Sequence, residues 1–165
     1  MVRARHVHWH KALKWLALSG LVIVLDQVSK QMIASAFKVG EGLRMTSFFD
    51  LVFVFNRGAA FSFLSDAGGW QRWFFIVLAL AVSSWITYML IRHAEENLLS
   101  AALALVLGGA LGNVIDRALH GAVVDFLSFH LADYYWPAFN VADSAISLGV
   151  ALMLWQQLVQ EKPAR

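Results

Sequence analysis

The chain has 165 residues, of which 59% are hydrophobic and 15% are charged, and its mean hydropathy is +0.62. Soluble domains contain about 45–50% apolar and about 25% charged residues, so this composition argues against a soluble domain and indicates an integral membrane protein. The small net charge of +2, without a long basic stripe, gives no sign of a nucleic-acid partner, and the lack of cysteine excludes disulfides, thiolate nucleophiles and cysteine-ligated metals.

Apolar stretches over residues 12–33, 73–91, 98–115 and 139–159 are long enough to span a bilayer as helices, which takes about 20 residues. The first stretch could be a cleaved signal peptide ending at the small residues 34–36, but it is too long for one and contains Asp26 and Lys30. We therefore expect a single membrane domain over residues 1–165, mainly α-helical, with four transmembrane helices.

Basic residues fix the expected orientation. They precede or begin the first stretch, end the second and follow the fourth, so the positive-inside rule places both termini in the cytoplasm. These residues are Arg3, Arg5, Lys11, Lys14, Arg92, Lys162 and Arg165. The outer segments, 34–72 and 118–138, then lie on the opposite side of the membrane.

The outer segments carry their own patterns. Residues 47–55 are rich in Phe and Val, which predicts a small extracytoplasmic β-sheet at the membrane surface, and a short helix is expected near residues 59–64. In the second outer segment, Tyr134, Tyr135 and Trp136 are typical of a water–lipid interface, so we expect a short interfacial segment there.

Polar residues in and beside the four stretches gather at one depth, near the outer boundary of the hydrocarbon. They are Asp26, Lys30, Asn113, Asp116, Arg117, Asp125, Asn140 and Asp143. Ionisable residues within spans usually mark a functional site, and their clustering strengthens that interpretation.

Two of these carboxylates suit peptide hydrolysis. If Asp125 and Asp143 lie close together they share one proton, so that one activates water while the other donates to the substrate carbonyl. Asp143 could also be a capping residue, with Asn140 as the N-cap of the last helix, and Asp125 could be a solvent-facing loop residue. Because a helix N-terminus favours negative charge, we expect Asp143 to be the ionised partner.

Other chemistries find less support in the sequence. It contains neither an HExxH zinc motif nor a G-x-S-x-G elbow, although Ser29 beside Lys30 leaves serine–lysine chemistry open. His130 and Asp133 are weak metal candidates, and we expect neither a metal nor a cofactor. The spacing of Gly108 and Gly112 predicts close helix packing.

Five motifs resemble those of the lipoprotein signal peptidase family, also called signal peptidase II, and follow that family's order. They are Asp26-Gln27-Val28-Ser29-Lys30, Phe55-Asn56-Arg57-Gly58-Ala59-Ala60-Phe61, GGALGNVIDR at 108–117, Val123-Val124-Asp125-Phe126 and Phe139-Asn140-Val141-Ala142-Asp143.

The resemblance implies an aspartyl peptidase in the bacterial cytoplasmic (inner) membrane, with its site near the periplasmic leaflet and a catalytic dyad of Asp125 and Asp143. The implied substrate is a prolipoprotein cut just before its diacylglyceryl-modified Cys, and globomycin-type cyclic peptides are the implied inhibitors. Residues expected to bind substrate or support the site are Asp26, Lys30, Asn56, Arg57, Gly58, Asn113, Asp116, Arg117, Asn140 and Ala142.

Two rival functions remain at this stage. Asp26, Asp125 and Asp143 could form the relay of a proton-coupled transporter, although the apolar cytoplasmic halves of the spans argue against one. The chain could also be a non-catalytic protein that binds lipoprotein precursors.

Overall fold

The computed structural model describes residues 9–58 and 68–160. Within these ranges the chain forms four long helices, α1 (Trp9–Ala36), α2 (Gln71–Arg92), α3 (Asn97–His120) and α4 (Val141–Gln160), each long and apolar enough to cross a membrane. They correspond to the predicted spans. The main difference is that α3 runs to His120, where Gly121 ends it in the left-handed conformation (φ 76°) and donates its N–H to the Arg117 carbonyl.

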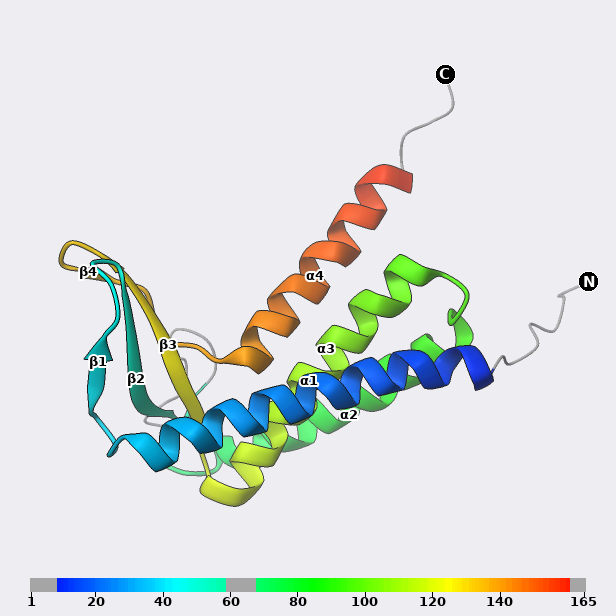
Figure 1. The fold of residues 1–165 in the computed structure, drawn as a ribbon. Coiled ribbons are helices and arrows are strands. Elements are labelled where there is room, and N and C mark those ends of the chain that lie inside the picture. The colour runs from blue at the N-terminus through cyan, green and yellow to red at the C-terminus, as the bar shows by residue number, and fades with distance from the viewer. Residues whose placement is uncertain (1–8, 59–67, 161–165) are drawn as a thin grey trace, which may run out of the picture.

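Helix α3 lies at the centre of the helical part and packs against α1, α2 and α4 (Figure 1). Small residues permit this approach. A methyl group at Gly108 would come within 2.7 Å of the Ser19 carbonyl oxygen of α1, and one at Gly109 would collide with the Ala142 carbonyl oxygen of α4. The packing predicted from the spacing of Gly108 and Gly112 is therefore present, and Gly109 extends it to α4.

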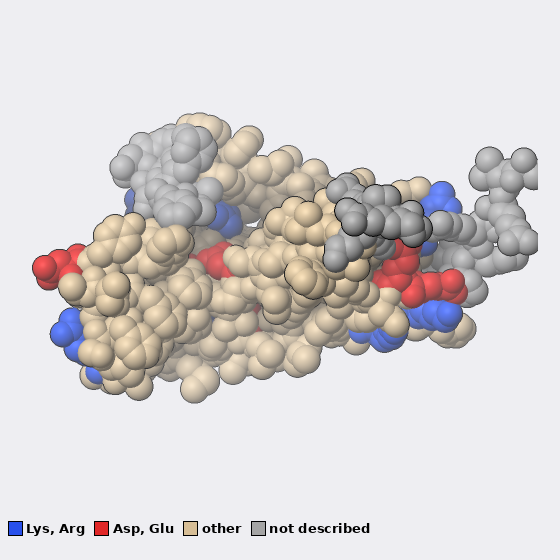
Figure 2. All heavy atoms as spheres, turned by 90° about the horizontal axis from the view of Figure 1, so that it is seen from above, with Lys and Arg blue, Asp and Glu red and all other residues tan. Residues whose placement is uncertain are grey.

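The outward faces of the helices are apolar. Val77 is 65% exposed, Met32 66% and Leu158 66%, although each belongs to a long hydrophobic helix. Charged side chains gather at the two ends of the molecule in Figure 2, and most of the surface between them is uncharged. Such a surface is stable in lipid and not in water, as expected for a transmembrane protein.

A small antiparallel sheet covers one end of the helices (Figure 1). Among the described residues its strands are β1 (Gly42–Arg44), β2 (Phe49–Asn56), β3 (Val123–Leu131) and β4 (Tyr134–Tyr135), in the order β1-β2-β3-β4. The predicted strand at 47–55 corresponds to β2. The prediction for the second outer segment was incomplete, because β3 is a full strand that pairs with β2 from Asn56 opposite Val123 to Phe49 opposite Phe129.

The inner face of the sheet rests on the outer end of α1. Phe53, Val124 and Phe126 form a buried cluster with Ile33 of α1, and this cluster fixes the sheet to the helices. The helix predicted near residues 59–64 lies outside the described residues. The start of α1 and the end of α4 both lie at the end of the molecule away from the sheet (Figure 1).

Candidate active site

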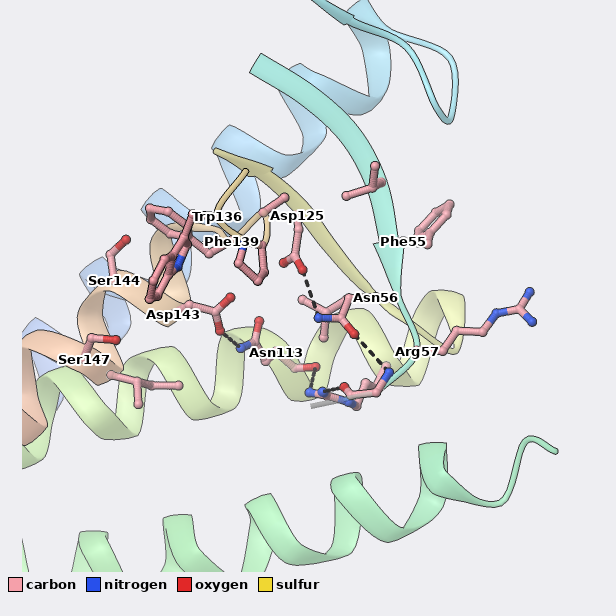
Figure 3. Close-up of a pocket in the computed structure, with 17 residues that line it drawn as sticks. Phe55, Asn56, Arg57, Asn113, Asp125, Trp136, Phe139, Asp143, Ser144 and Ser147 are labelled. Carbon is pink, nitrogen blue, oxygen red and sulfur yellow. Dashed lines mark hydrogen bonds between the residues drawn. The ribbon is translucent and has the colours of Figure 1, made fainter. Parts of the chain in front are cut away.

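A cavity of about 810 Å³ lies between the sheet and the adjoining ends of α3 and α4. Its walls come from residues 54–58, from β3, from α3, from residues 136–139 and from the first turns of α4. This volume is typical of a ligand-binding pocket. Asp125 and Asp143 both line the cavity, Asp125 from β3 and Asp143 from α4 (Figure 3).

An extended segment before α4 brings the two acids together. The carbonyl of Phe139 accepts the N–H groups of Phe126 and Leu127, and the N–H of Phe139 donates to Leu127, so this segment runs antiparallel along β3. The next residue, Asn140, directly precedes α4. The start of α4 is thereby held beside the middle of β3, where Asp125 lies.

Asp125 is buried, with 2% of its surface exposed, and amide groups face its carboxylate. Asn56 donates to Oδ2 at 3.1 Å and Asn140 donates to Oδ1 at 2.7 Å. Burial, and then the negative charge of Asp143, raise the pKa of Asp125 from 3.8 to about 7, against the opposing effect of these two hydrogen bonds. Asp125 therefore holds its proton between its ordinary pKa of 3.8 and about 7, where an ordinary carboxyl is ionised.

Asp143 occupies the first turn of α4. Its backbone N–H donates to Asn140 Oδ1 at 2.9 Å, which makes Asn140 the N-cap predicted from the sequence. Its carboxylate does not simply complete a cap, because Asn113 of α3 donates to Oδ1 at 2.8 Å. The positive end of the α4 dipole favours the ionised form of a carboxylate here.

A buried lysine connects the helices beneath the two acids. Lys30 Nζ lies 2.7 Å from Asp26 Oδ2 and 2.8 Å from Asp116 Oδ2, and it donates to Asn113 Oδ1 at 3.1 Å. Asp26 and Lys30 are four residues apart on α1, a spacing that favours an ion pair, and Asp116 of α3 is a second anion beside Lys30. Asp26, Lys30 and Asp116 are all less than 5% exposed.

The same two carboxylates hold the backbone just before each acid of the cavity. Asp26 Oδ1 accepts the N–H of Ala142 at 2.9 Å, one residue before Asp143. Asp116 Oδ2 accepts the N–H of Val124 at 2.9 Å, one residue before Asp125. Lys30 thus couples two anchors that set the positions of β3 and α4.

Arg117 supports the outer wall of the cavity. Its Nη2 donates to the Gly58 carbonyl at 2.8 Å, and its guanidinium lies over the ring of Phe75 with 5.1 Å between Cζ and the ring centroid. Gly58 also donates its N–H to Asn56 Oδ1 at 3.0 Å. Arg57 lines the rim, but its guanidinium points away from the two carboxylates in Figure 3.

Comparison with protein families identifies the chain's relatives. The family model described as "Signal peptidase (SPase) II" matches residues 18–159. The chain belongs to the signal peptidase II family. It is thus a member of a family of proteases, and its four apolar helices agree with a bacterial membrane protein.

Individual relatives agree with this assignment. A lipoprotein signal peptidase of Azoarcus sp. (strain BH72) is 60% identical over 146 residues, covering 88% of this chain and 83% of that protein. One from Cupriavidus necator is 53% identical, with the same coverage. A solved structure described as a bacterial membrane enzyme has a TM-score of 0.80 at 31% identity, covering 92% of this chain and 93% of the other. The family resemblance and the fold predicted from sequence are confirmed.

Some residues of the site escaped the sequence interpretation. Gln27 donates to Asp116 Oδ1 at 2.8 Å and to the Gly112 carbonyl at 3.2 Å, so it links α1 to α3. Its place beside Asp26 within a signal peptidase II motif was the available signal. Ser144 and Ser147 of α4 also line the cavity, and their positions one turn after Asn140 and Asp143 could have indicated this.

Proposed function

We propose that this chain is an aspartyl endopeptidase that removes signal peptides from diacylglyceryl-modified prolipoproteins, cutting just before the lipidated Cys. The observation that carries the proposal is that Asp125 and Asp143, from separate elements, line one cavity in a chain of the signal peptidase II family. Asp125 accepts amide hydrogen bonds on β3, whereas Asp143 lies at the positive end of α4, and this asymmetry supports separate acid and base roles.

The two acids take different roles in this proposal. Asp143, at the positive end of α4, is the ionised partner and takes a proton from a water molecule, whose oxygen attacks the scissile carbonyl carbon. Asp125, whose pKa is raised to about 7, gives its proton to the carbonyl oxygen. When the tetrahedral intermediate collapses, the proton held by Asp143 passes to the leaving amine and one hydroxyl proton of the intermediate returns to Asp125, so that one water is consumed and both acids regain their starting states.

Basic residues at the end of the molecule away from the sheet indicate how the protein is oriented in the membrane. Lys11 and Lys14 of α1 contact Glu95 and Asn97 at the end of the molecule away from the sheet. The positive-inside rule makes that end cytoplasmic. In the cytoplasmic membrane of a bacterium, the cavity then lies at the periplasmic leaflet, where the modified Cys of a precursor is held by its acyl chains.

Turnover by the purified protein tests the proposal. The wild type should cleave a diacylglyceryl-modified precursor and leave the unmodified precursor intact, whereas Asp125→Asn and Asp143→Asn should cleave neither while remaining folded. Asp133→Asn, at an exposed position outside the cavity, is the matched control and should cleave normally. Binding of the modified precursor without any cleavage by the wild type would instead identify a non-catalytic binding protein.

Inhibition offers a second readout. A globomycin-type cyclic peptide should compete with the precursor for the cavity and raise its KM without lowering kcat.

A further inference from the structure

The cavity continues along α4 beyond the two acids, toward the interior of the span. Ser144, Ile146 and Ser147 form this part of its wall, after Asp143 (Figure 3). A helix rises about 1.5 Å per residue, so Ser147 lies about 6 Å further along α4 than Asp143 and on the same face. Ser147 therefore places a hydroxyl group in the part of the cavity that extends from the acids toward the interior of the bilayer.

The hydroxyl of Ser147 differs from the others on the helices. Serines in apolar helices usually donate to a nearby backbone carbonyl. Ser144 does so to Asn140 at 2.9 Å and Ser84 to Leu80 at 2.8 Å. Ser147 is exposed in the cavity wall, and its hydroxyl makes no hydrogen bond to any residue that the structure describes.

Once a ligand fills this part of the cavity and excludes water, an unpaired hydroxyl becomes unfavourable, so such a ligand should provide an acceptor. Ser83 is the other helix hydroxyl of the described ranges without a partner, but it is buried and outside the cavity. Among the described helix residues, Ser147 therefore combines a hydroxyl without a protein partner and a position in the cavity wall.

The substrate of the proposed function carries a suitable acceptor. A diacylglyceryl group is attached through the sulphur of the Cys that follows the scissile bond, and its ester carbonyls accept hydrogen bonds but cannot donate them. About eight bonds of roughly 1.5 Å separate the scissile carbon from an ester carbonyl carbon, which allows a reach of up to about 10 Å. The offset of about 6 Å between Asp143 and Ser147 falls within this reach.

We propose that Ser147 is a specificity-determining residue that donates a hydrogen bond to an ester carbonyl of the substrate's diacylglyceryl group. This inference rests on the proposed function. It assigns to Ser147 part of the discrimination between a lipidated and an unmodified Cys, one helical turn after Asp143 on α4.

The test compares Ser147→Thr, which keeps the hydroxyl, with Ser147→Val, which has nearly the same shape without it. Each is assayed on a precursor carrying ester-linked diacylglyceryl and on one carrying ether-linked dialkylglyceryl. The host bilayer is made of ether-linked phospholipid, so that the substrate is the one source of ester carbonyls in the assay. Ser84→Val, on the lipid-facing side of α2 and outside the cavity, is the matched control.

We expect Ser147→Val to lower kcat/KM for the ester substrate about threefold to tenfold relative to Ser147→Thr, the range of one neutral hydrogen bond. For the ether substrate the two variants should be equal. The control variant should behave as wild type on both.

Each contrary result has a definite meaning. Equal losses on both substrates would show that Ser147 acts through packing, and no loss on either would show that it makes no contact with substrate; both overturn the inference while leaving the peptidase intact. If Ser147→Val lowers kcat/KM only when ester-linked phospholipid replaces the ether-linked bilayer, the acceptor belongs to bulk lipid, and this result would also overturn the inference. If the wild type cleaves neither precursor, the proposed function itself fails.

Discussion

The pH range of activity should be set by Asp125, and Asn56 provides a means to move it. The amide of Asn56 donates to Asp125 Oδ2 at 3.1 Å and so favours the ionised carboxylate, which opposes the rise of its pKa to about 7. In the proposed mechanism the protonated form of Asp125 is active. Activity therefore falls as pH rises through this pKa, and Asn56→Ala should extend activity to higher pH.

The size of the shift follows from the bond that is lost. A hydrogen bond to a charged group contributes about 1.5–3 kcal/mol, and one pKa unit corresponds to about 1.36 kcal/mol, so complete loss would raise the pKa of Asp125 by about one to two units. Water entering the cavity replaces part of the interaction. We expect the alkaline limb of the rate profile to move upward by about one pH unit.

The assay is kcat/KM for cleavage of the lipidated precursor between about pH 5 and pH 9 in bilayer discs. Asn56 also accepts the N–H of Gly58, so the variant should be slower overall, and the position of the limb is the readout. Asn97→Ala, which removes a contact with Lys14 outside the cavity, should leave the limb in place. An unchanged limb in Asn56→Ala, or one displaced to lower pH, would refute the assignment of Asp125 as the acid.

Three further predictions concern the support of the site and the folded state. Lys30→Met should destabilise the protein by about 3–5 kcal/mol because it leaves two buried carboxylates unpaired. Lys11→Met, the control, removes an exposed ion pair and should cost at most about 1 kcal/mol. Thermal unfolding in detergent measures both variants. Gly109→Ala should lower both the melting temperature and kcat because its methyl group displaces the start of α4, while Gly20→Ala, with open space around it, should lower neither. Because the pKa of Asp125 is higher in the fold than its ordinary 3.8, the unfolded chain loses this proton first, so wild-type stability should fall between pH 4 and pH 7 by up to about 4 kcal/mol; a stability curve for Asp125→Asn with the same slope would contradict this.

Much of the helical part was predictable from the sequence because bilayer thickness imposes a length and an apolar composition on each span. The local relationships near the site were also accessible, since i, i+4 spacing placed Lys30 beside Asp26 and the N-cap pattern placed Asn140 before Asp143. The family motifs supplied the remaining candidates.

The sheet was harder to predict. Strand β3 contains Asp125 and His130 among apolar residues, and its aromatic continuation resembled an interfacial segment. Its identity as a strand depends on pairing with β2, which is far away in sequence, and such non-local pairing leaves a weak local signal. The second anion beside Lys30, Asp116, was missed for a similar reason, because its position depends on how α1 packs against α3.

The contact of Gly109 with the backbone at Ala142 has a consequence for how such a protein adapts to its surroundings. The location of Asp143 depends on main-chain contact across the inner faces of α3 and α4, and the side chains that face lipid take no part in it. Lipid-facing side chains can therefore change to match a thicker or thinner bilayer, because they do not set the position of Asp143. The spacing of the two acids stays unchanged when such substitutions relieve hydrophobic mismatch.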